Sequence, residues 1–174
     1  MLSKAEIIAA IETAFQSVKY PGDSCLRNSN EGTEPFLLED EFKGKDNRAE
    51  LDPAFLDQAP DGFSSALSFF SAEAFRFYLP AYLIADLRGQ LESADPTFHL
   101  GHGLYSASAN TKINPARYGE RTWGDYAKHR WSMFTPQQLL AIRLYLDHKL
   151  EEDQVDYFVE EAMVTFWWPI TGDA

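Results

Sequence analysis

Apolar side chains recur at intervals of three and four residues in several parts of the chain, a spacing typical of amphipathic helices. Near the N-terminus the spaced residues are Ile7, Ile11, Phe15 and Val18. Ser3 and Glu6 form a capping-box sequence, so a helix is predicted from about residue 4 to residue 19. Pro21 and Gly22 end it, because neither residue easily continues a helix.

The strongest apolar signal is the aromatic-rich run from Ser68 to Leu87. Its main stripe, at four-residue spacing, consists of Phe75, Leu79, Leu83 and Leu87. Other apolar side chains lie off that stripe, so we expect neighbouring elements to cover this central helix on several sides. Pro80 lacks an N–H group and its ring crowds the carbonyl of Arg76, which predicts a kink, or two pieces over about 72–79 and 80–92.

Two shorter helices are predicted between these segments. Pro35 suits a first helical turn with acidic residues nearby, which favours a helix over about 34–43. Asp52 before Pro53 offers an N-cap and a first helical residue for a second one. The sequence Pro60-Asp-Gly is expected to end it.

The C-terminal third predicts a helical hairpin over residues 135–168. Thr135 and Gln138 form a capping box, and apolar residues follow at Leu139, Ile142, Leu146 and Leu150. A final amphipathic helix is predicted from Val155, Phe158, Ala162 and Phe166, with its end near Pro169. Two adjacent helices with a short connection pack antiparallel, and we expect this hairpin to pack against the central helix.

Between residues 93 and 134 regular periodicity is weak. Thr122 can cap a short helix, and the stretch 98–106 is expected to be extended. The length of this segment is unusual for a connection, since structureless loops beyond about 15 residues are uncommon and often functional. Together these patterns predict an all-α fold, a single domain over residues 1–174 with a long irregular insert at about 93–134.

Charge narrows the choice of partners. The net charge of the 174 residues is −12, and it is unevenly distributed. Residues 31–61 hold ten acidic and three basic residues (−7), residues 132–174 hold eight and two (−6), and residues 93–131 hold three and five (+2). An acidic surface repels phosphates and anionic lipids, so neither nucleic acid nor a membrane is expected as a partner.

Location is predicted from the N-terminus and from cysteine usage. No apolar stretch follows a basic region in the first residues, so we expect no secretory signal. Cys25 is the single cysteine, which excludes an internal disulfide and a site built from several thiolates. A cytoplasmic location follows from these two observations.

Three motifs resemble those of a family of small bacterial proteins of unknown function. They are Leu51-Asp-Pro-Ala-Phe-Leu56, Phe69-Phe-Ser-Ala-Glu-Ala-Phe-Arg-Phe-Tyr-Leu-Pro-Ala-Tyr-Leu83 and Phe134-Thr-Pro-Gln-Gln138. The proline-centred run is the most specific of them. The resemblance implies a mostly helical bacterial protein and supplies no catalytic residue; the insert is the least family-like segment.

Candidate chemistry is sparse. His99 and His102, with a carboxylate, could form a zinc site with an open position, but Gly101 disfavours a helical presentation of both rings. Two loop histidines near the surface are the simpler interpretation, and neither a metal nor another cofactor is expected. Cys25 has no identified basic partner that would activate it.

A basic, aromatic cluster stands out in the insert of this acidic chain. Its members are Arg117, Tyr118, Arg121, Trp123, Tyr126, Lys128, His129, Arg130 and Trp131. Arginine and aromatic side chains are enriched in binding hot spots, so the cluster is a candidate interface. The alternative is that Trp123 and Trp131 complete the helical core while the charged groups stay in water.

The preferred functional hypothesis is a non-enzymatic protein-interaction domain, with contact surfaces in residues 93–131, 31–61 and 151–161. One concrete version is an immunity-type protein that neutralises a basic toxin, because an acidic surface steers association with a basic partner. A metal-dependent hydrolase using His99 and His102 is one alternative. A small-molecule binding module with a pocket lined by Tyr78, Tyr82 and Trp123 is another, and a homo-oligomer stays open.

Overall fold

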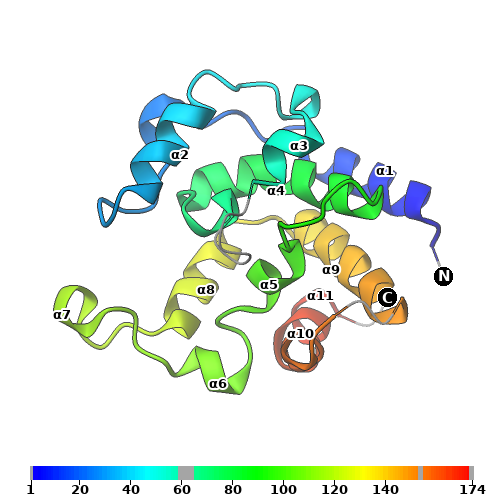
Figure 1. The fold of residues 1–174 in the computed structure, drawn as a ribbon. Helices are drawn as coiled ribbons and strands as arrows, with labels where there is room; N and C mark the ends of the chain where they lie inside the picture. The colour runs from blue at the N-terminus through cyan, green and yellow to red at the C-terminus, as the bar shows by residue number, and fades with distance from the viewer. Residues whose placement is uncertain (1, 59–64, 153–154, 173–174) are drawn as a thin grey trace. The chain divides into compact units, whose positions relative to one another are not determined.

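The computed structural model describes residues 2–58, 65–152 and 155–172. They fall into two compact units, one from Ser3 to Pro96 and the other from Thr97 onward. Regular structure in both units is helical, which confirms the predicted all-α class (Figure 1). The prediction of a single domain, and of a hairpin packed on the central helix, concerns how the units join and stays a prediction.

Helices α1 (Lys4–Phe15), α2 (Glu34–Phe42) and α3 (Pro53–Leu56) confirm the three predicted helices in the first half of the chain. The capping box of α1 forms as expected, with the Ser3 amide donating to Glu6 Oε2 at 2.8 Å. Helix α1 ends at Phe15 instead of residue 19, because the Arg48 guanidinium donates to the carbonyls of Phe15 and Val18. The predicted stop at Pro60-Asp-Gly lies outside the described residues.

The central helix α4 (Ala72–Leu87) runs through Pro80 without interruption, so the prediction of two pieces is wrong. Proline removes the hydrogen bond that would end on the Arg76 carbonyl. Side chains on both sides of Pro80, such as Phe75 and Leu83, are fully buried and hold the two halves in one helix. Helix α4 packs against α1, α3 and the 3₁₀ turn η2 (Arg48–Glu50), as its apolar circumference predicts.

Aromatic rings fill the core around one end of α4. The Tyr78 ring stacks on Phe70, with centroids 4.9 Å apart, and meets Phe42 edge to face at 4.9 Å. Phe42 in turn contacts Phe55 at 4.8 Å. Because these rings come from α2, α3 and α4 and from the turn before α4, their packing joins the elements of this unit.

The insert is more regular than its sequence pattern indicates. It contains α5 (Pro96–Gly101), α6 (Ser106–Ala109), α7 (Pro115–Tyr118) and α8 (Trp123–Ser132). The predicted Thr122 cap of α8 is confirmed, but the expectation of extended chain over 98–106 is wrong, since α5 occupies its first part. Helix α5 is too short to show periodicity, and burial of Leu100 stabilises it.

The C-terminal helices begin with α9 (Pro136–Glu151), which has the predicted Thr135 capping box. One helical stretch follows: α10 (Tyr157–Ala162), the π-helix η4 (Met163–Trp167) and α11 (Trp168–Thr171). The stretch ends at Thr171, two residues after Pro169, which confirms the predicted end near this proline.

The Asp57 carboxylate holds the loop that follows α4. Its oxygens accept hydrogen bonds from the amides of Glu92 (3.0 Å), Ser93 (2.8 Å) and Ala94 (2.9 Å). Burial alone would raise the pKa of Asp57, but the three amide donors together outweigh burial and lower it.

Asp57→Ala should therefore lower the free energy of unfolding by about 1–3 kcal/mol at neutral pH, because three amides lose a charged acceptor. The difference from the wild type is complete above the unfolded pKa of about 4 and shrinks as the pH falls below it. Urea unfolding at several pH values measures both quantities. Asp40→Ala, at an exposed position on α2, is the matched control and should change stability by less than about 0.5 kcal/mol; an equal effect of the two variants would refute the anchoring role.

Candidate functional site

The basic, aromatic cluster of the insert lies on α7, on α8 and between them, and Trp131 at its end is part of the core. Trp131 is 2% exposed, and its ring lies 4.8 Å from Trp167 and 5.0 Å from Phe134, between centroids. Arg130 is also buried; its Nη2 donates to the Tyr126 hydroxyl at 3.1 Å. Trp131 therefore lies in the helical core, as the alternative interpretation of the cluster predicts.

Several of the remaining members of the cluster pair with one another. Arg117 lies 5.5 Å from the centre of the Tyr118 ring, and Arg121 lies 5.6 Å from that of Tyr126. Arg117 and Arg121 are exposed, whereas Trp123 and Tyr126 are half-buried. Each of these aromatic faces already meets a cation or a ring of its own segment, and a role of the cluster as an interface stays a prediction.

The two candidate histidines lie in and just after α5, among aromatic rings. His102 stacks on Phe98, with centroids 5.2 Å apart, and meets the Trp123 ring at 4.7 Å. His99 is buried, and burial, aided by the charges of Arg130 and His102, lowers its pKa to about 3. These contacts replace the predicted surface location with an aromatic, partly desolvated one.

A zinc site also requires further ligands. Within residues 2–58, 65–152 and 155–172, no three His, Cys, Asp or Glu side chains gather in a position to hold a metal ion. Besides burial, the charge of Arg130 lowers the pKa of both histidines, so the region is positively charged where a metal site needs carboxylates. The side-chain arrangement therefore gives the metal-dependent hydrolase no support.

The two tyrosines of the predicted pocket are core residues. Tyr78 and Tyr82 are both fully buried, and the Tyr78 hydroxyl donates to the Lys45 carbonyl at 2.8 Å. Trp123 belongs to the other unit, so a pocket shared with it stays a prediction. The cavity found in the Ser3–Pro96 unit is lined from α4 by other side chains, Pro80 and Ile84 among them.

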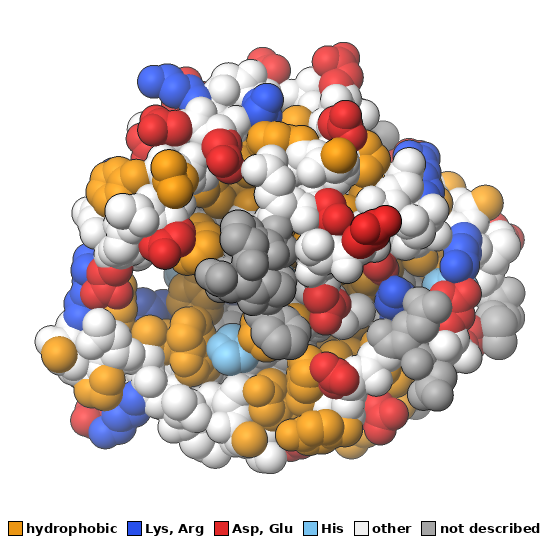
Figure 2. Space-filling view, in the orientation of Figure 1, with side chains coloured by type: hydrophobic (Ala, Val, Ile, Leu, Met, Phe, Trp, Pro, Cys, Tyr) orange, Lys and Arg blue, Asp and Glu red, His pale blue; other side chains and the backbone are white. Residues whose placement is uncertain are grey.

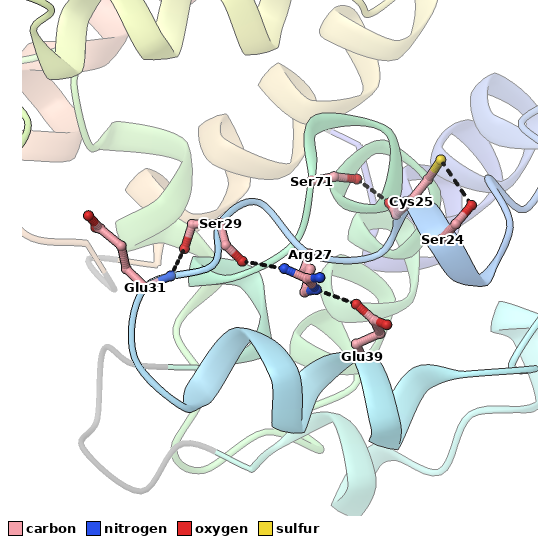
Figure 3. Close-up of polar contacts among 7 residues, drawn as sticks. All are labelled: Ser24, Cys25, Arg27, Ser29, Glu31, Glu39 and Ser71. Atoms are coloured by element: carbon pink, nitrogen blue, oxygen red, sulfur yellow. Dashed lines mark hydrogen bonds and ion pairs between the residues drawn. The ribbon is translucent and has the colours of Figure 1, made fainter. Parts of the chain in front are cut away.

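Sequence reasoning missed a polar network around Arg27, which Figure 3 shows. The Arg27 guanidinium donates to the Glu39 carboxylate and, at 3.0 Å, to the Ser29 carbonyl. It also lies 4.3 Å from the centre of the Phe36 ring. Cys25 contributes its carbonyl, which accepts from Ser71 Oγ, while its thiol lies 3.9 Å from Ser24 Oγ. The network thus fixes α2 and its exposed Phe36, and it offers the thiol no base.

Exposed hydrophobic side chains coincide with the acid-rich segments. Eight large hydrophobic residues are exposed in the described part of the chain. Seven of them lie in residues 31–61 or 132–174, namely Phe36, Leu37, Leu140, Tyr157, Val164, Trp168 and Ile170. None of the eight lies in the basic insert. Figure 2 shows acidic side chains with hydrophobic ones between them on one face.

Near the C-terminus one of these exposed side chains, Trp168, is held in place by α9. Trp168 is 41% exposed, and its Nε1 donates to Asp147 Oδ1 of α9 at 3.0 Å. Val164, 60% exposed, lies one helical turn before it. Asp147 also accepts from Arg143 Nε at 3.1 Å, and Arg143 donates to Thr171 Oγ1 at 3.2 Å. Helix α11 is therefore anchored to α9.

The fold defines an all-helical protein, and no group of metal ligands assembles among the described residues. None of the described helices is long and apolar enough to cross a membrane. The chain belongs to a family described as Family of unknown function (DUF6714), whose model matches residues 3–171, and this confirms the resemblance seen in the sequence. No curated protein and no solved structure matches the chain.

The buried, neutral state of His99 predicts an acid-sensitive stability. In the unfolded chain His99 has a pKa of about 6.5 and takes up a proton below that pH. In the folded chain its pKa is about 3, so it stays neutral until the pH falls much further. Stability is therefore lost as the pH falls through this window. Between about pH 7 and about pH 5, the wild type should lose roughly 2 kcal/mol more than His99→Gln.

Urea unfolding at each pH measures this difference. His129→Gln, at an exposed position of α8, is the control and should keep the wild-type pH dependence. If His99→Gln also keeps the wild-type pH dependence, His99 is not a buried neutral imidazole in the folded protein.

Proposed function

We propose that this protein binds another protein whose surface combines basic and apolar groups. The observation that carries the proposal is the coincidence of exposed large hydrophobic residues with the two acid-rich segments. A binding surface needs apolar area for affinity, and surrounding charges select the partner and accelerate its approach. Both ingredients are present on α2, whereas η4 and α11 supply apolar side chains beside the Asp147 carboxylate of α9.

The α2 surface is also preorganised. Phe36 is 44% exposed, yet one face of its ring is covered by Arg27, which Glu39 and the Ser29 carbonyl hold in place. Leu37, next to it, is 57% exposed. A side chain fixed before binding loses less conformational entropy when the partner arrives, so Phe36 is suited to be an anchor.

The concrete version of this proposal is the neutralisation of a basic protein toxin by an immunity-type mechanism. The net charge of −12 supports it, because attraction to a basic protein raises the association rate. Deleting the gene in a strain with its neighbouring genes intact should then cause toxicity. A healthy deletion strain would exclude this version while leaving other basic partners open.

Two double variants test the proposal at the level of binding. Partners captured on the immobilised protein are identified, purified and titrated against the wild type, Phe36→Ser/Leu37→Ser and Val164→Ser/Ile170→Ser. At least one double variant should raise the Kd about tenfold or more, because hot-spot truncations commonly cost about 2 kcal/mol. Raising the salt concentration should slow association, since it screens the acidic surface.

The matched control is Arg117→Ala/Arg121→Ala, at exposed positions of the basic insert. Circular dichroism verifies that all variants are folded. Loss of binding in the arginine variant, with both apolar variants unaffected, would place the interface on the insert and contradict the proposal. If the protein is found to bind only itself, the partner is a second copy of the chain and not a basic protein.

A further inference from the structure

A cavity of about 380 Å³ lies within the Ser3–Pro96 unit, beside α4. Small-molecule sites commonly have volumes of about 300–1,000 Å³, mostly apolar walls and a few polar groups. The volume lies in this range, and the walls are mixed, with nearly as much polar as apolar surface. The apolar part comes from α4 and from the segment before and within α3, including Pro80, Ile84, Leu51, Pro53 and Leu56.

Small side chains on α4 create the space. Ala81 and Ala85 line the cavity one helical turn apart, next to Pro80 and Ile84. Pro80 therefore lines the cavity and is also part of the buried helix α4. A longer side chain at position 81, which is half-buried, would project into the cavity and occupy part of its volume.

Arg48 contributes a fixed positive charge. Its guanidinium donates to the Val18 carbonyl at 3.1 Å and to the Phe15 carbonyl, and lies 4.9 Å from the centre of the Phe77 ring. These partners are neutral, and no carboxylate of the described chain forms an ion pair with Arg48. The half-buried charge is thus held rigidly without a counter-ion, and burial lowers its pKa.

The other polar lining residues set the charge of a suitable ligand. Arg88, the C-cap of α4, adds a second guanidinium, Glu12 adds one carboxylate, and Gln90 is neutral. With Arg48, the lining carries two positive charges and one negative charge, a formal excess of +1. A monoanion balances this excess, whereas a polyanion such as a nucleotide would be repelled by Glu12.

We propose that this cavity binds a small monocarboxylate with an apolar body, the carboxylate at Arg48 and Arg88 and the body against Pro80 and Ile84. The volume accommodates about a dozen non-hydrogen atoms, since a water molecule in the liquid occupies about 30 Å³. A simple carboxylic acid and a free apolar amino acid share this chemistry, and Glu12 would favour the amino acid through its ammonium group. The site is independent of the protein-binding surfaces.

Calorimetric titration of the full-length protein with three probes tests the assignment: 3-phenylpropanoate, phenylalanine and the uncharged 3-phenylpropanamide. At least one of the two carboxylates should bind with a Kd at or below about 1 mM, and the amide about tenfold more weakly. Tighter binding of phenylalanine, lost in Glu12→Gln, would identify an amino-acid site. Tighter binding of phenylpropanoate would identify a simple carboxylate site.

Two variants that retain the Arg48 anchor locate the ligand. Ala81→Leu should weaken carboxylate binding about tenfold by filling the cavity, and Arg88→Gln should weaken it about threefold. Arg117→Gln, in the other unit, is the matched control and should bind as the wild type does. The proposal would be overturned if neither carboxylate binds, or if the amide binds as tightly as they do. It would also be overturned if Ala81→Leu, with its fold verified by circular dichroism, binds as the wild type does.

Discussion

The burial of α4 is the constraint on which the rest of the Ser3–Pro96 unit depends. This helix is apolar around most of its circumference, so it must be covered on several sides at once, and α1, α3 and η2 supply that cover. The same burial keeps the helix continuous through Pro80, where one backbone hydrogen bond is missing. One face of α4 can then pack in the aromatic core while another lines the cavity.

One face of α4 is filled and another is open. Tyr78 and its aromatic neighbours pack without exposure, whereas Ala81 and Ala85 leave volume beside Pro80. The positive charge of Arg48 beside that volume meets neutral partners, the carbonyls of Phe15 and Val18 and the Phe77 ring. The cavity and the surface of α2 are therefore two separate opportunities for binding within one unit.

Local signals in the sequence predicted the elements well. The caps at Ser3, Asp52, Thr122 and Thr135 form as expected, because a cap involves residues only two or three positions apart. The prediction of two pieces at Pro80 failed for a reason that a local pattern does not contain. This proline is tolerated within one helix through contacts that depend on the folded context.

The candidate site was harder to predict than the fold. In α2, Leu38 and Phe42 are buried while Phe36 and Leu37 are exposed, and only the packing of the helix separates these two pairs. The insert shows the converse: an aromatic cluster suggestive of an interface contributes Trp131 to the core. Residue type alone indicates what a side chain can bind, whereas burial decides whether it is available.

Native-state hydrogen exchange of the α4 amides tests the central claim most directly. If burial holds α4 together as one element, the amides of Tyr78 and Leu79, before Pro80, and of Leu83 and Ile84, after it, should exchange with the same opening free energy. That value should equal the stability of the whole unit. Exchange of one group at a clearly lower free energy would mean that the helix opens as two separate pieces, and it would contradict the account.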